Sequence, residues 1–180
     1  ADKMSQNILF ASPVSGTVAE VVRGEKRKLL EVRIKADANQ EYVDFGKKNV
    51  AELSAQQIKE ALLEAGLWPA LIQRPYGIIA NPETKPKAIF VSTFSTAPLA
   101  ADLDYTLNDE LANIQTAIDA LAKLTDGGVH VGIGAANESV TPFRKLQNAV
   151  LHTVAGKHPA GNVGVQIHHI SPVQKGEIVW

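Results

Sequence analysis

The five histidines offer the most obvious chemistry in this sequence: His130, His152, His158, His168 and His169. No two are spaced four residues apart as zinc ligands on one helix face would be, and there is no cysteine. We therefore expect no metal site and no iron–sulfur cluster. His130 and His152 lie in predicted strands and are expected to be half-buried. His158 differs, because GKHPAG (156–161) joins a predicted strand to a predicted helix, at the edge of an α/β sheet where ligands bind.

The string GIGAAN (132–137) follows a predicted strand and weakly matches the glycine fingerprint of dinucleotide-binding loops. No helix is predicted to begin before Thr141, and no acidic residue ends the next strand. An ordinary strand-to-loop junction is the favoured interpretation, with nucleotide binding as the alternative. No nucleophile elbow, Walker loop or Ser-His-Asp order is present, so we assign no catalytic residue.

The segment ASPVSGTVAEVVRGEKRKLLEVRI (11–34) resembles half of a lipoyl- or biotinyl-type hammerhead domain. Carrier domains of that type place a modified lysine at a hairpin tip beside a methionine, and no Met-Lys pair occurs here. We expect only part of a β-sandwich, whose second half-motif would precede residue 1. The basic turn from Arg23 to Lys28 is expected to be a solvated hairpin tip; the alternative is a docking contact with a partner subunit.

The elements that position these residues change character near residue 50. Residues 8–45 predict short antiparallel strands. Residues 53–67 predict a helix capped by Ser54 and Gln57, and 68–86 predict an irregular stretch. The remainder alternates between strands and helices, which favours a parallel, Rossmann-like sheet in the α/β class. Its expected strands are 88–92, 129–134, 151–156 and 177–180; its expected helices run from Asn108, from Thr141 to Val150, and over 161–170. The predicted domains are therefore 1–48, a partial hammerhead-like β-sandwich, and 49–180, a Rossmann-like domain truncated at its C-terminal end.

Composition narrows the range of partners. The chain has 180 residues, 45% of them hydrophobic, and a formal net charge of −1. This balance does not favour nucleic acid, and no apolar run reaches the roughly 18 residues of a membrane span. The polar start and the strand-like end both look cut, so we expect an internal piece of a longer protein.

Five strings then occur in a characteristic order: SPVSGTVAEVVRGEKRKLLEVRI, EALLEAGLWPALIQRPYG, AIFVSTFSTAPLAAD, LAKLTDGGVHVGIG and GKHPAGNVGVQIHHISPV. In this order and spacing they are similar to the A subunit of the Na+-translocating NADH:quinone reductase. The resemblance covers essentially the whole chain. It implies a fold related to the flavin- and NADH-binding subunit of complex I and to the C subunit of the Rnf complex.

Those two relatives hold FMN in a glycine-rich loop, and this sequence departs from that loop. Only Gly66 and Gly77 remain, and bulky Trp68 and Leu71 fill positions where backbone N–H groups would wrap a phosphate. A second flavin segment keeps Pro98 but has Ser95 and Ala97 where two glutamates would stand. The resemblance therefore implies that this chain binds no cofactor, while FMN, FAD, NADH and an iron centre belong to the rest of the complex.

The resemblance implies a quinone-linked subunit of a sodium-pumping NADH:ubiquinone oxidoreductase. It would be peripheral at the cytoplasmic face of the bacterial inner membrane, with other subunits and ubiquinone as partners and no membrane span of its own. The chain alone is not expected to be catalytic. Two alternatives stay open: a vestigial FMN/NADH-binding module, and an assembly scaffold without a small-molecule site. The candidate quinone cleft consists of Trp68, Arg74, Tyr76, Ser95, Thr96 and His158. The alternative for Trp68 and Leu71 is that they plug the former flavin pocket.

Overall fold

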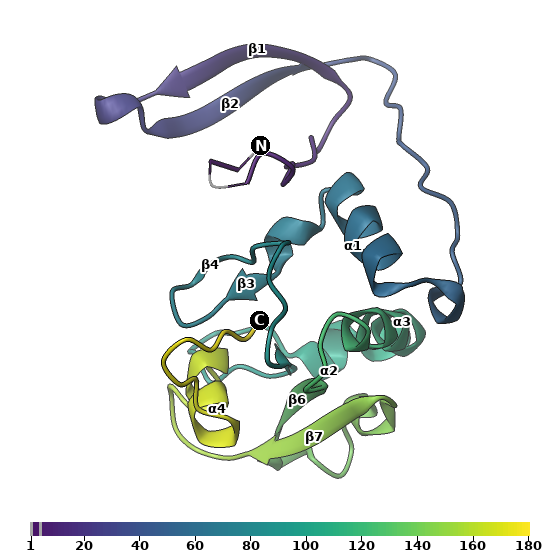
Figure 1. Cartoon of the computed structure of the whole chain (residues 1–180), viewed down its shortest axis with the longest axis vertical. Helices are drawn as coiled ribbons and strands as arrows, with labels where there is room; N and C mark the ends of the chain where they lie inside the picture. Colours follow the sequence, from purple (N-terminus) through teal and green to yellow (C-terminus); the bar gives the residue numbers. More distant parts are fainter. Residues whose placement is uncertain (1, 4) are drawn as a thin grey trace. The chain divides into compact units, whose positions relative to one another are not determined.

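A computed structural model describes residues 2–3 and 5–180 (Figure 1). The chain divides into two compact units, which we describe separately. The smaller unit is Phe10–Lys47, and the larger combines the residues up to Leu9 with Lys48–Trp180. Residues up to Leu9 group with the larger unit, and Ile8 is buried in its core, 1% exposed.

The smaller unit is a single antiparallel ribbon of β1 (Gly16–Arg23) and β2 (Leu29–Ala36). Two register shifts interrupt the pairing, after Val18 and after Val22, which adds local twist. The expected strand EYVDF (41–45) does not form: none of its residues joins a sheet. A two-stranded ribbon covers neither of its faces, so its valines and leucines stay exposed. They include Val18, Val21, Leu29, Leu30 and Val32.

The larger unit begins with α1 (Ala55–Glu64), whose start follows the predicted capping box. Ser54 Oγ accepts from the Gln57 N–H, and the Gln57 side chain accepts from the Ser54 N–H. Gly66 follows the helix with φ +69°, a left-handed conformation that glycine adopts without a Cβ clash. The predicted irregular stretch 68–86 contains a 3₁₀ turn, Trp68–Ala70, and a short hairpin of β3 (Ile72–Gln73) and β4 (Ile78–Ile79).

The predicted parallel sheet is confirmed, with strand order β5 (Ile89–Ser92), β6 (Val129–Gly134), β7 (Ala149–Val154). The expected fourth strand makes only a partial pairing on the free edge of β5. There the Trp180 N–H donates to the Ala88 carbonyl, and the Phe90 N–H donates to the Trp180 carbonyl.

Two helix predictions need correction. The helix expected from Asn108 is preceded by an additional turn, α2 (Leu103–Thr106), capped by the Asp102 carboxylate. Residues Asn108–Glu110 then form a 3₁₀ turn, and α3 runs over Leu111–Ala122 without a side-chain cap. Asn108 does not cap α3 because the 3₁₀ turn places Glu110, two residues later, at the N-cap position. The helix expected to reach Val150 is a 3₁₀ turn, Pro142–Lys145; it ends because the backbone is already extended at Leu146, and β7 then begins at Ala149.

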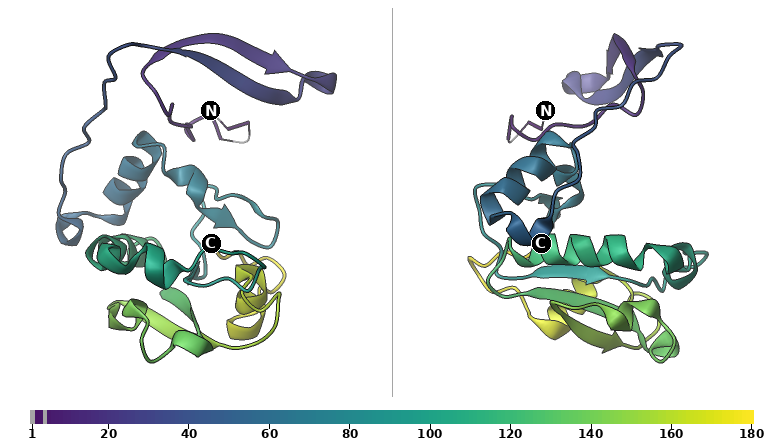
Figure 2. Two further views of the ribbon diagram at one scale, coloured as in Figure 1. Left: turned by 180° about the vertical axis from the view of Figure 1, so that it is seen from behind. Right: turned by 90° about the vertical axis from the view of Figure 1, so that its right-hand side faces the viewer.

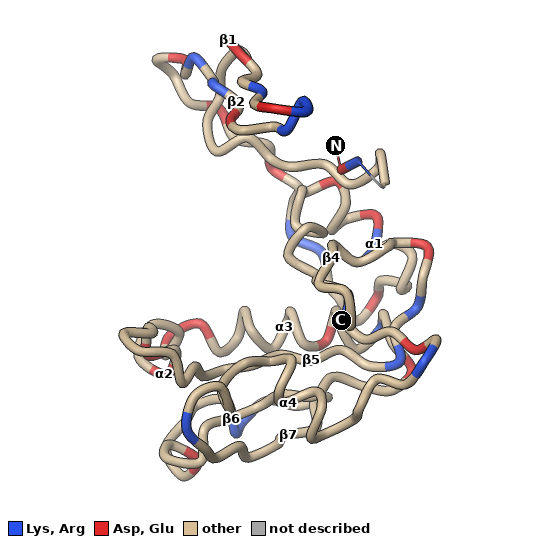
Figure 3. The backbone as a smooth tube through the Cα atoms, turned by 90° about the vertical axis from the view of Figure 1, so that its left-hand side faces the viewer, with Lys and Arg blue, Asp and Glu red and all other residues tan. Residues whose placement is uncertain are grey.

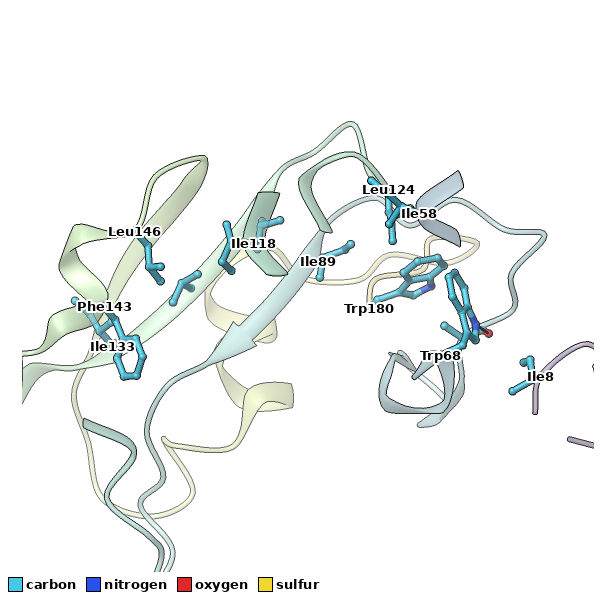
Figure 4. Close-up of a cluster of buried hydrophobic side chains, with 13 residues drawn as sticks. Ile8, Ile58, Trp68, Ile89, Ile118, Leu124, Ile133, Phe143, Leu146 and Trp180 are labelled. Carbon is cyan, nitrogen blue, oxygen red and sulfur yellow. Dashed lines mark hydrogen bonds between the residues drawn. The ribbon is translucent and has the colours of Figure 1, made fainter. Parts of the chain in front are cut away.

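The sheet lies between α3 on one face and α4 (Val163–Ile170) on the other (Figure 2). Alternation along the strands decides which residues each helix covers. Ile89, Val129 and Val131 pack in the cluster with Ile118 of α3, whereas Phe90 packs with Ile167 of α4 and Val179. Figure 4 shows the larger cluster extending from Ile8, Trp68 and Trp180 on one side to Ile133 and Phe143 on the other. Among the described residues, no helix is both long and apolar enough to span a bilayer.

Candidate functional site

A hollow in the larger unit lies where the three parallel strands end. It has a volume of about 490 Å³ and is formed by the segments that follow β5, β6 and β7. Its lining comprises Thr93–Thr96, Ala100–Asp104, Gly134–Asn137 and Val154–Gly156. This is the edge at which open α/β sheets bind ligands, because strand ends and loop amides converge there.

The HPAG loop reaches this edge through Thr96. Thr96 Oγ1 accepts a hydrogen bond of 2.9 Å from the Gly161 N–H and lies 3.4 Å from His158 Nδ1. The Gly161 N–H uses one of the two lone pairs of this hydroxyl, so the hydroxyl proton can be donated to Nδ1 in the tautomer of His158 that has no proton there. In that tautomer the proton of a neutral His158 is on Nε2. His158 is exposed, so its Nε2–H is available to an acceptor from outside.

The backbones of the two loops meet so closely that only glycine fits at position 161. A Cβ built there would lie 2.3 Å from the Thr96 nitrogen, far inside van der Waals contact. Gln166 of α4 connects the same loop to β5, because its amide donates to Ser92 Oγ at 2.9 Å and to the Gly161 carbonyl at 3.2 Å. Thr96, Gly161 and α4 are thus held in one arrangement, which orients His158.

The opposite wall of the hollow is organised by Asp104. Its carboxylate accepts from Thr141 Oγ1 at 2.6 Å and from Asn137 Nδ2 at 2.9 Å, which joins α2 to the segment after β6. Asp102 and Asp104 are the charged residues of the lining, and no lysine or arginine belongs to it. The electrostatics of the hollow therefore oppose phosphate and other anions and suit an uncharged ligand.

The glycines of GIGAAN do not form an open phosphate cradle. The space beside Gly132 is occupied by Gln166, whose Oε1 would lie 2.1 Å from a Cβ at that position. The space beside Gly134 is occupied by the Phe94 ring, at 3.4 Å. Gly132 therefore permits a close approach of Gln166, whereas the Phe94 ring lies at ordinary van der Waals distance from a Cβ at Gly134.

The structure does not bring all six residues of the predicted cleft together. Ser95, Thr96 and His158 gather at the carboxyl edge of the sheet. Trp68 is fully buried at the far end of the core cluster, edge-to-face with Trp180 at 5.4 Å and 81°. Its Nε1–H donates to the Ala80 carbonyl at 2.7 Å, so the indole fills the protein interior and lines no wall of the hollow.

Arg74 and Tyr76 also lie away from that edge. The Arg74 backbone pairs with Val179, and its side chain borders a separate hollow of about 270 Å³ beside His168. Tyr76 is 79% exposed in the β3–β4 turn. The reason is topological: the loop of residues 68–77 packs beside the start of β5, while Ser95 follows its end.

Sequence reasoning missed Asp104, Asn137 and Phe94 as parts of this site. Asn137 stands in GIGAAN, but its partner is 33 residues away in a turn that no sequence pattern predicted. Among the described residues, no group of three metal-ligating side chains occurs.

Comparison with known proteins gives two family matches along the chain. Residues 53–180 match the model described as the NqrA second alpha/beta domain, and residues 1–37 match the NqrA N-terminal barrel-sandwich hybrid domain. Proteins named as the A subunit of Na(+)-translocating NADH-quinone reductase are similar over 99% of the chain. They include those of Yersinia pseudotuberculosis and Glaesserella parasuis, each 36% identical, and Neisseria meningitidis, 35% identical. The chain spans about 40% of the length of these relatives.

Proposed function

Because this chain belongs to the NqrA family, we propose that it is part of the NqrA subunit of a sodium-translocating NADH:quinone reductase. We further propose that its role is quinone-linked, through the carboxyl edge of the sheet. The names of the relatives support the assignment to this complex, and the sequence resemblance supports ubiquinone as the substrate. The flavins, NADH site and iron centre belong to other parts of that complex in this proposal, so the chain alone is not the catalyst.

The observation that carries the quinone assignment is the Thr96–His158 pair beside a hollow without cations. A quinone is an uncharged ring with two carbonyl acceptors, and each carbonyl needs a donor when it leaves water. In the tautomer that accepts from Thr96 at Nδ1, the Nε2–H of His158, which adjoins the lining residue Thr96, is such a donor. Phe94 and Leu103 give the hollow apolar surface for the ring.

The two alternatives are less well supported. An FMN- or NADH-binding module needs cations or free backbone amides for phosphate, and the lining supplies no cation while Gln166 and Phe94 occupy the glycine positions. A scaffold without a small-molecule site is favoured by the buried Trp68, which fills the region of the former flavin loop. The hollow of about 490 Å³ argues for a ligand beyond that scaffold role.

The remaining features of the proposal concern architecture and location. We propose a Rossmann-like relation to the flavin subunit of complex I, supported by the parallel β5-β6-β7 sheet with helices on both faces. We place the boundary between the two sequence domains near residue 48, with residues 1–48 assigned to the hammerhead-like domain, although the residues up to Leu9 group with the larger unit in the fold. The proposed location is peripheral, at the cytoplasmic face of the inner membrane, in contact with other subunits.

A short-chain, water-soluble ubiquinone titrated into the ¹⁵N-labelled chain tests the assignment. The expected result is saturable shifts of the Thr96, Gly134 and Gly161 amides, lost in His158→Phe. Tyr76→Phe, a matched change on an exposed ring distant from the site, should bind normally. Shifts confined to the Trp68 and Trp180 indoles, no saturable shift, or equal binding by His158→Phe would overturn it. FMN in a parallel titration should leave the same amides unshifted.

A further inference from the structure

The end of the β1–β2 ribbon concentrates positive charge. Arg23 ends β1, and Lys26, Arg27 and Lys28 follow within the turn to Leu29. Glu25 is the single acid between Arg23 and Leu30, so this tip carries four cations against one anion. Figure 3 shows these basic residues gathered at the turn of the ribbon.

The turn holds its cations in an unusual backbone conformation. Lys26 and Arg27 have φ of +53° and +62°, the left-handed region that non-glycine residues rarely occupy. The turn is closed by backbone bonds from the Gly24 N–H to the Lys28 carbonyl and from the Lys28 N–H to the Glu25 carbonyl. Arg23 Nη1 donates to the Arg27 carbonyl at 3.1 Å.

The four cations lack internal ion-pair partners among the described residues. In the ribbon the ion pairs are those of Arg33 with Glu20 and Glu31, and none involves Arg23, Lys26, Arg27 or Lys28. Two leucines adjoin the charges: Leu29 is 52% exposed and Leu30 is 58% exposed. Register places Leu29 directly opposite Arg23, so cations and apolar side chains share the same end of the ribbon.

We propose that this tip, Arg23–Leu30, docks on the surface of a membrane that contains anionic phospholipid. Basic residues near such a surface are attracted to its headgroups, and adjacent apolar side chains can enter the interface. Each bound residue contributes separately, so a narrow tip suffices. An acidic protein surface fits less well, because a stable protein interface requires roughly 20 residues per side and the tip has about eight.

Co-sedimentation of the whole chain with phosphatidylglycerol/phosphatidylcholine vesicles and with pure phosphatidylcholine vesicles, at low ionic strength, tests this proposal. Binding is expected to the anionic vesicles alone and should fall steeply with added salt. Replacing Arg23, Lys26, Arg27 and Lys28 together by Gln should lower partitioning several hundredfold, since each cation contributes roughly a fivefold factor and the four factors multiply to about 600.

The matched control replaces four cations elsewhere, Lys47, Lys48, Lys145 and Lys175, by Gln and therefore changes the net charge equally. This control variant should bind the anionic vesicles as the unchanged chain does, because its tip is intact. The double variant Leu29→Ser, Leu30→Ser should reduce the part of the vesicle binding that persists at high salt. Circular dichroism of each variant checks that it is folded. Equal loss in the control, equal binding to both vesicles, or binding to soluble polyglutamate but to neither vesicle would overturn the proposal.

Discussion

His130 Nδ1 and His152 Nε2 lie 2.8 Å apart across the adjacent parallel strands β6 and β7. Their ring planes are 24° apart, and Phe90 of β5 stacks on His130 at 4.9 Å. At this distance one of the two facing nitrogens must carry a proton and the other a lone pair. The half-buried positions predicted for both histidines are confirmed, but their contact was not predicted.

This pair should make stability depend on mildly acidic pH. Burial, and then the charge of His130, lower the pKa of His152 below its ordinary value of 6.5. As the pH decreases below 6.5, the unfolded chain is protonated at this histidine while the folded chain is not. The free energy of unfolding therefore decreases as the pH decreases, until the pH is below the lowered pKa of the folded state. Urea midpoints measured between pH 7.5 and 5 should decrease, and His152→Gln should flatten the decrease. If exposed His169→Gln flattens it equally, the pair is not the cause.

Trp68 should be a stability residue rather than a ligand wall. Trp68→Phe removes the bond to the Ala80 carbonyl and leaves that acceptor buried, which costs about 1–3 kcal/mol, plus a packing loss. Trp180→Phe is the matched control, because the buried Trp180 Nε1 has no hydrogen-bond partner among the described residues. Chemical denaturation should rank Trp68→Phe as clearly less stable than Trp180→Phe. The reverse order would contradict the assigned contacts.

Lys123 should contribute more to the free energy of unfolding than an ordinary surface lysine does. Its Nζ donates to the carbonyls of Val50, Ala51 and Leu53 at 2.6–2.9 Å, which fastens the end of α3 to the segment before α1. Lys123→Met keeps the aliphatic stem and removes three charge-assisted hydrogen bonds, so we expect a loss of about 1–3 kcal/mol in urea unfolding. Lys59→Met, which loses one such bond, to Pro82, should cost less. Equal costs would refute the argument.

Gly132 and Gly134 should respond differently to an added methyl group. Gly132→Ala drives a Cβ into Gln166 Oε1, whose amide is held by Ser92 and Gly161, and overpacking of this kind costs about 1–3 kcal/mol. Gly134→Ala meets Phe94 at 3.4 Å and should be nearly neutral. Thermal melts of the two variants provide the comparison. A neutral Gly132→Ala would show that the space is open and would reinstate the phosphate-cradle interpretation.

Local patterns determined much of this protein from the sequence alone. The capping box at Ser54, the buried strands 88–92 and 129–134, and the alternation of strands and helices each depend on neighbouring residues, and the structure confirms them. The family was also recognisable, because its strings recur in order along the chain. The errors fell where local signals are weak: Asn108 as a cap, the helix to Val150 and the strand 41–45.

Tertiary structure alone decided which residues meet. Thr96 and His158 are 62 residues apart, and they touch because parallel strands β5 and β7 end at the same edge of the sheet. Trp68 belongs to the same predicted cleft by sequence, yet it is buried beside Trp180 because its loop packs near the opposite end of β5. Periodicity reports which face of an element is buried, whereas strand order and crossover geometry determine which loops share an edge.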